Sequence, residues 1–164
     1  MSIVTQDSSK TSYGSRLEVT DAIRKVMVID GLTWKSLYEK LKPLINMDLS
    51  KEWIVSACLG QNSMPGVVAE MVTEILGLHI TAIPWLMKAP IRAGYDISHD
   101  PLVCRLNEAI NVYGETIKEL VHEEFGDGIM SAIDFDLTIG KQIVNGVPRV
   151  SINMTGKYLE YKKF

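Results

Sequence analysis

PLVCRLNEAINVYGETIKELVHEEFGDGIMSAIDF is the sequence of residues 101–135. This stretch decides the fold of the 164-residue chain, because it predicts a long helix, the end of that helix and the start of a strand. Asp100 and Pro101 form a start signal, because Asp suits the N-cap and Pro suits the first helical position. Phe125-Gly126-Asp127-Gly128 is the expected stop, since Gly adopts the left-handed conformation that ends helices. Apolar residues recur between them at helical spacing and predict a core-facing stripe: Leu102, Leu106, Ala109, Ile110, Tyr113, Ile117, Leu120 and Val121.

A second row of side chains runs beside this stripe and contains Arg105 and Glu108. Residues three apart on a helix can meet, so an exposed ion pair worth a few tenths of a kcal/mol (roughly 0.2–0.5) is one interpretation. A functional pair is the other. A cation near the helix N-terminus opposes the macrodipole, and acid after base is the weaker order. Neither detail decides between the two interpretations.

The N-terminal half predicts a polar tail over 1–14 and a helical domain over 15–88. Thr33 is an expected N-cap, and Pro43 is an expected end of the second helix. Short helices with tight connections are typical of a helix-turn-helix domain. Four helices are expected at about 17–29, 33–42, 50–59 and 65–76, followed by a further short helix and a linker within 79–94.

Such a domain raises the alternative of a DNA-binding regulator. Its recognition helix would be about 50–59, which carries only Lys51 and Glu52 as charged residues. DNA affinity depends on Lys and Arg contacts to phosphate, so this helix favours a packing role instead.

The C-terminal domain, 89–164, changes its pattern after Ser131. Apolar residues then alternate with polar ones, and Asn145-Gly146 is a hairpin signal. We expect one helix followed by two to four short strands. So few elements cannot cover both faces of a sheet, so the pattern predicts a second copy of the chain as partner.

Composition narrows the class of protein. A net charge of −3 gives no electrostatic case for nucleic acid or an anionic membrane. Two cysteines make no disulfide framework, and residues 1–16 lack the apolar run of a secretory signal. No apolar run approaches the length needed to span a membrane. The expected location is therefore the cytoplasm.

Rival chemical sites are weaker. His79, His99 and His122 show no metal-ligand spacing, so no metal site is expected. Ser131 has no His at a telling spacing for a serine hydrolase. Cys104 beside Arg105 fits a nucleophile less well than a small buried residue at a helix start.

The amino-acid sequence of the long helix and the segment after it resembles that of cyanases (cyanate hydratases). The resemblance is close over about 101–159 and looser before it. It is carried by Arg105-Leu106-Asn107-Glu108, Val112-Tyr113-Gly114, the run from Phe125 to Ile133, and Gly156-Lys157-Tyr158-Leu159.

This resemblance implies a lyase that decomposes cyanate with bicarbonate, through carbamate, to ammonia and carbon dioxide. It implies Arg105, Glu108 and Ser131 as catalytic residues, and bicarbonate as co-substrate with no metal or other cofactor. The implied fold is α+β: a helix-turn-helix-like N-terminal domain, then a helix-plus-short-strands domain that interlocks with a second subunit. Dimers of this kind assemble into a homodecamer, with no nucleic acid or membrane as partner.

The three residue types suit small anions. Arg offers a fork of donors for carboxylate-like oxygens, and a Ser hydroxyl with nearby backbone amides can bind oxygen where negative charge develops. Glu108 either orients Arg105 or holds a proton. About 26 residues of helical rise would place Arg105 and Ser131 about 39 Å apart, so the set is expected to draw on different subunits.

Overall fold

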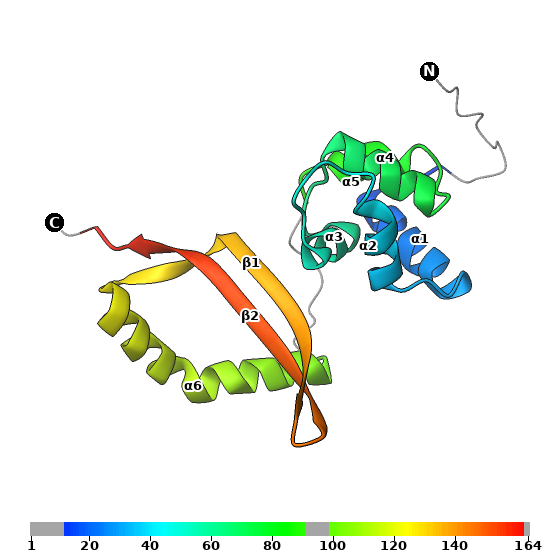
Figure 1. The fold of residues 1–164 in the computed structure, drawn as a ribbon. Helices are drawn as coiled ribbons and strands as arrows, with labels where there is room; N and C mark the ends of the chain where they lie inside the picture. Colours follow the sequence, from blue (N-terminus) through cyan, green and yellow to red (C-terminus); the bar gives the residue numbers. More distant parts are fainter. Residues whose placement is uncertain (1–11, 91–98, 163–164) are drawn as a thin grey trace. The chain divides into compact units, whose positions relative to one another are not determined.

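The structure is a computed structural model that describes residues 12–90 and 99–162. The chain divides into two compact units, Met1–Arg92 and Ala93–Phe164, and each is described by itself (Figure 1). Most of the expected polar tail (1–11) and most of the segment leading into the long helix (91–98) lie outside the described residues.

The described part of the N-terminal unit is helical, as expected. Side chains of Ser15, Thr33 and Ser50 cap the first three helices by accepting backbone N–H groups, so the expected N-cap at Thr33 is confirmed. The helices are α1 (Arg16–Ile29), α2 (Trp34–Leu41), α3 (Lys51–Cys58), α4 (Gly66–Ile75) and α5 (Ala82–Met87).

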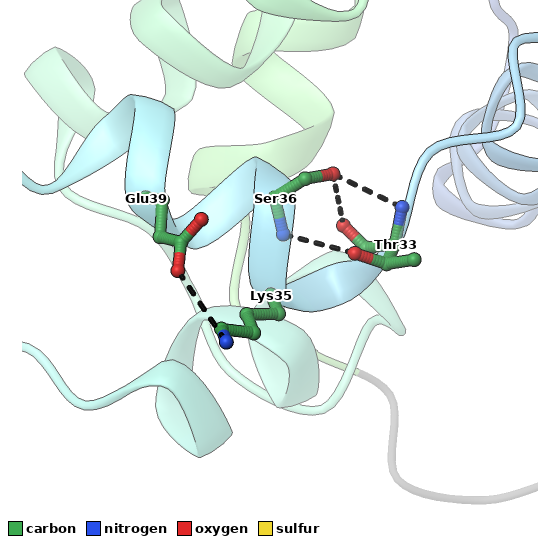
Figure 2. A network of polar contacts seen from close by, with 4 residues as sticks. All are labelled: Thr33, Lys35, Ser36 and Glu39. Carbon is green, nitrogen blue, oxygen red and sulfur yellow. Dashed lines mark hydrogen bonds and ion pairs between the residues drawn. The ribbon is translucent and has the colours of Figure 1, made fainter.

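The start of α2 shows how local chemistry sets a helix boundary. Thr33 Oγ1 accepts from Ser36 N at 3.0 Å, and Ser36 Oγ accepts in return from Thr33 N at 3.0 Å (Figure 2). This reciprocal capping box satisfies two amides that have no partner within the helix. One turn on, Lys35 and Glu39 form an exposed ion pair at 3.8 Å (Figure 2).

The hydrophobic core of this unit draws on every helix. Each aliphatic side chain buried in this core stabilises the fold by about 1.5–3 kcal/mol. Its largest fully buried side chains are Ile23, Leu37, Leu41, Ile54, Leu86, Val19, Val68, Val72 and Cys58.

The C-terminal unit contains α6 (Pro101–Phe125), β1 (Gly128–Val144) and β2 (Val147–Glu160). Asp100 Oδ1 accepts from the amides of Leu102 and Val103 at 2.9 and 3.2 Å, which confirms the predicted start. Gly126, with φ 89°, ends the helix. Asn145 and Gly146, with φ 52° and 77°, make the tight turn of a two-residue hairpin, as predicted.

Two expectations for this unit are corrected. The two strands of the described residues agree with the expected two to four, but they are long, with 17 and 14 residues, and form one antiparallel ribbon instead of a set of short strands (Figure 1). The apolar stripe of α6 is not core within the chain: Leu102 is 64% exposed, and no residue of α6 is buried. The physical reason is geometric, because one helix and one two-stranded ribbon cannot enclose an interior.

Candidate active site

Arg105 and Glu108 lie one turn apart near the start of α6, and the predicted pair forms. Arg105 Nη1 donates to Glu108 Oε2 in a short ion pair. The two side chains are 79% and 57% exposed, so the contact adds little to the stability of a single chain. Its effect is directional, because the carboxylate holds one edge of the guanidinium and leaves the other N–H donors available to an anion.

Ser131 lies at the start of an irregular stretch of the ribbon. Regular pairing stops at Met130, opposite Tyr158, and resumes at Phe135, opposite Gly156. Four residues of β1 therefore face one residue of β2, which is a bulge of the kind that redirects side chains. We call residues 131–134 the β1 bulge. Ser131 is only 7% exposed.

The hydroxyl of Ser131 holds the β1 bulge together. Its Oγ accepts from the backbone N–H groups of Ile133 at 3.1 Å and Asp134 at 3.0 Å. A hydroxyl has two acceptor positions and one proton, so these bonds leave the proton as the group that can engage a further oxygen. Ser131 is therefore set up to donate, which suits an anionic ligand.

The sequence predicts that backbone amides near Ser131 join it in binding a negatively charged oxygen, and this stays a prediction for the β1 bulge as a whole. The amides of Ile133 and Asp134 point at Ser131 Oγ instead, so they act through the hydroxyl and are not themselves available to a ligand.

The single chain brings Arg105 and Glu108 together but does not join them to Ser131. Among the described residues, neither member of the ion pair hydrogen-bonds to Ser131. From Arg105 to Phe125 the helix rises by about 30 Å, and Ser131 follows beyond that end. The three predicted residues thus form two separate half-sites within one chain.

The cysteines differ from each other and from the expectation. Cys104 is exposed, so the prediction of a buried residue at the helix start is wrong, because no residue of α6 is buried in the described part of the C-terminal unit. Cys58 is buried, and burial raises the pKa of its thiol to about 12, although nearby Arg16 acts in the opposite direction. A thiol of this kind is a packing residue and not a nucleophile.

Arg16 was missed by the sequence reasoning. Its Nη2 donates to the carbonyl of Ala57, at the end of α3, and Thr20 Oγ1 donates to the carbonyl of Cys58 at 3.4 Å. Burial lowers the pKa of the Arg16 guanidinium. Arg16 thus places a cation at the C-terminal end of α3, where the helix dipole is negative. This role is structural, and no local sequence motif predicts it.

Other kinds of site receive no support from the described geometry. In residues 12–90 and 99–162, no group of three or more His, Cys, Asp or Glu side chains is arranged to hold a metal ion. Within the same ranges, no helix has the length and apolar character needed to cross a membrane. Lys51 of α3, the cation of the hypothetical recognition helix, pairs with Glu52 at 3.3 Å.

Two domain families match the chain in succession. Residues 16–90 match the family described as cyanate hydratase, N-terminal, and residues 95–163 match the cyanate lyase C-terminal domain. The class of protein is therefore that of two-domain cyanate lyases, in which a helical domain is followed by a domain of one helix and a two-stranded ribbon.

Full-length relatives agree with the domain matches. Cyanate hydratases of Albidiferax ferrireducens and Methylobacillus flagellatus are 43% and 44% identical over 152 residues, covering 92% of this chain and 99% of theirs. The crystal structure of cyanase from T. urticae matches with a TM-score of 0.75 at 34% identity, covering 87% of this chain and 96% of that one. The chain belongs to the cyanate hydratase (cyanase) family. The regulator alternative finds no support in these comparisons.

Proposed function

We propose that this protein is a lyase that decomposes cyanate with bicarbonate. The observation that carries the proposal is the guanidinium of Arg105, held by Glu108 on an exposed face of α6, in a chain that matches cyanate hydratases along both domains. A guanidinium fixed on one edge fits the planar, carboxylate-like oxygens of bicarbonate, and its remaining N–H donors can also bind cyanate, which is a small linear anion.

The reaction proceeds in two steps. Bicarbonate oxygen bonds to the cyanate carbon, and the adduct, with one proton taken up, breaks to carbamate and carbon dioxide. Carbamate takes up a second proton and releases ammonia and another carbon dioxide. Every step moves protons and electron pairs only, so the chemistry needs no redox cofactor and we propose none. Arg105 binds the negatively charged oxygens of the substrates, and Glu108 orients Arg105. The Ser131 hydroxyl donates a hydrogen bond to an oxygen on which negative charge develops.

We propose that the site is completed by other copies of the chain, in a homodecamer built from interlocking dimers. Ile110, Ile117 and Leu120 of α6 are between 47% and 59% exposed, and apolar side chains exposed together on one face are typical of an interaction site. Association is also what would join the half-site of Arg105 to the half-site of Ser131.

The ribbon supplies a second uncovered face. Residues directly opposite in an antiparallel pair share a face, and Ile139 with Ile152 and Ile143 with Pro148 put apolar groups on one side. Alternate pairs such as Gln142 with Arg149 put polar groups on the other. An amphipathic ribbon of this length favours a partner along its apolar side. Two cysteines in a chain of this size make no disulfide framework, which favours a reducing compartment, and we propose the cytoplasm.

The test is ammonia release from cyanate by the purified protein, with bicarbonate present and then stripped from the buffer. We expect turnover that requires bicarbonate and a sedimentation coefficient well above that of an 18.3 kDa monomer. A folded, oligomeric protein without turnover in either buffer would refute the proposed activity. Full turnover by a monomer would refute the shared site.

A further inference from the structure

Gly156 of β2 lies against the backbone of Ser131. A Cβ at position 156 would collide with the carbonyl oxygen of Ser131, and would lie 3.3 Å from its carbonyl carbon and 2.6 Å from Cγ of Met130. Contacts below about 3 Å are not tolerated between carbon atoms, so a side chain here must move something. Met130 can rotate away, but the carbonyl of Ser131 is part of the chain and cannot do so alone.

The carbonyl that Gly156 contacts belongs to the same residue as the hydroxyl that closes the β1 bulge. Gly156 stands opposite Phe135, where regular pairing resumes, while the Ser131 hydroxyl is held by the amides of Ile133 and Asp134. The bulge is therefore fixed from two sides, by its own hydrogen bonds and by the close approach of β2. A shift of the Ser131 backbone would carry the hydroxyl with it.

We propose that Gly156 is a positioning residue for Ser131: the absence of a side chain at 156 lets β2 set the place of the catalytic hydroxyl. The inference rests on the proposed function, because it assigns a purpose to the placement of Ser131. Gly in a strand commonly marks a bulge or a close backbone approach, and here both occur together.

The other glycines of the ribbon do not share this geometry. A Cβ at Gly128 would meet Leu159 O and the Tyr158 hydroxyl, both at 2.5 Å, on the opposite strand and away from Ser131. A Cβ at Gly140 would meet only Ser151 Cβ, at 3.9 Å, an ordinary contact. Gly140→Ala is therefore a matched control for Gly156→Ala, with the same substitution in the same ribbon.

The first measurement compares kcat/KM for cyanate in these two variants, with sedimentation and circular dichroism to establish folding and assembly. A displacement near 1 Å in a catalytic group can cost about 10²-fold, and we expect a loss of that order in Gly156→Ala. We expect Gly140→Ala to retain the wild-type value. Wild-type kcat/KM in Gly156→Ala would overturn the inference.

The second measurement separates contact with Met130 from contact with Ser131. Met130→Ala removes the flexible group beside Gly156, so the double variant Met130→Ala/Gly156→Ala keeps only the clash with the Ser131 carbonyl. We expect the double variant to assemble and to remain as impaired as Gly156→Ala. Recovery to the level of Met130→Ala would overturn the inference, as would failure of both Gly156 variants to assemble, which would make Gly156 a residue needed for folding.

A double-mutant cycle with Ser131→Ala distinguishes a positioning role of Gly156 from a purely structural one, because it measures whether the two losses of kcat/KM add. If Gly156 acts through Ser131, adding Gly156→Ala to Ser131→Ala causes no further loss. Additive losses would overturn the inference. Wild-type turnover by Ser131→Ala alone would instead refute the assignment of Ser131 in the proposed function, so the two failures are distinguishable.

Discussion

Replacement of Arg105 by Ala is the most direct test of the candidate site. The substitution removes the guanidinium from α6 and leaves Glu108 without its partner. Two hydrogen bonds to a charged group, at about 1.5–3 kcal/mol each, sum to about 3–6 kcal/mol of lost transition-state stabilisation. At 1.36 kcal/mol per tenfold, the expected fall in kcat/KM is about 10²- to 10⁴-fold.

The effect on folding is expected to be small. The Arg105 side chain is 79% exposed and its partner is 57% exposed, so solvent screens the ion pair and its removal costs well under about 1 kcal/mol. Arg105→Ala should therefore unfold at nearly the wild-type temperature and sediment as the wild type does. Arg105→Lys keeps the charge but not the planar fork, and an intermediate loss is expected.

The N-terminal unit offers a matched control. Lys35 and Glu39 form a helix ion pair (Figure 2). Their side chains are 79% and 62% exposed, close to the 79% and 57% of Arg105 and Glu108. Lys35→Ala removes an equally exposed cation and should leave turnover unchanged. Ammonia release by both variants is measured at several cyanate concentrations with bicarbonate in excess. Turnover of Arg105→Ala within twofold of wild type, or an equal loss in Lys35→Ala, would refute the reasoning.

Three further predictions concern stability and use unfolding followed by circular dichroism. Leu37→Ala, at a fully buried position, should lower the free energy of unfolding by about 2–5 kcal/mol, whereas Leu44→Ala, 55% exposed, should cost much less; equal losses would contradict the described core. Asp100→Ala removes the cap of α6 and should cost about 1 kcal/mol; an unchanged melting temperature would count against the cap. Burial raises the Cys58 pKa from its ordinary value of 9.0 to about 12, so the folded protein holds the thiol proton more tightly than the unfolded chain does. The stabilisation from this thiol is therefore complete below pH 9 and is lost as the pH rises toward 12. Stability of Cys58→Ala should consequently depend less on pH across this window, and identical slopes would argue against the buried thiol.

Much of the secondary structure could be predicted because its signals are local. The start of α6 depends on Asp100 and Pro101, and the hairpin turn depends on Asn145 and Gly146, which adopt positive φ with little cost. The pairing of Arg105 with Glu108 follows from helical spacing alone. Each of these features involves residues a few positions apart.

Other features of the candidate site could not be predicted in this way. The strand lengths were underestimated, because alternation after Ser131 is broken by the β1 bulge, whose register shift depends on the facing strand. The apolar stripe of α6 was expected to be core, because a periodic pattern identifies the face that needs cover without saying which chain provides it.

The sequence by itself determined the start of α2, both ends of α6, the turn between the two strands, the family and the residue types suited to an anion. The tertiary structure decided that the Ser131 hydroxyl accepts from two amides and keeps its proton for donation, and that Gly156 lies against the Ser131 carbonyl. The physical reason is range. Caps and turns are set by neighbours along the chain, whereas contacts across a bulged ribbon join residues far apart in sequence, whose register depends on many weak interactions at once.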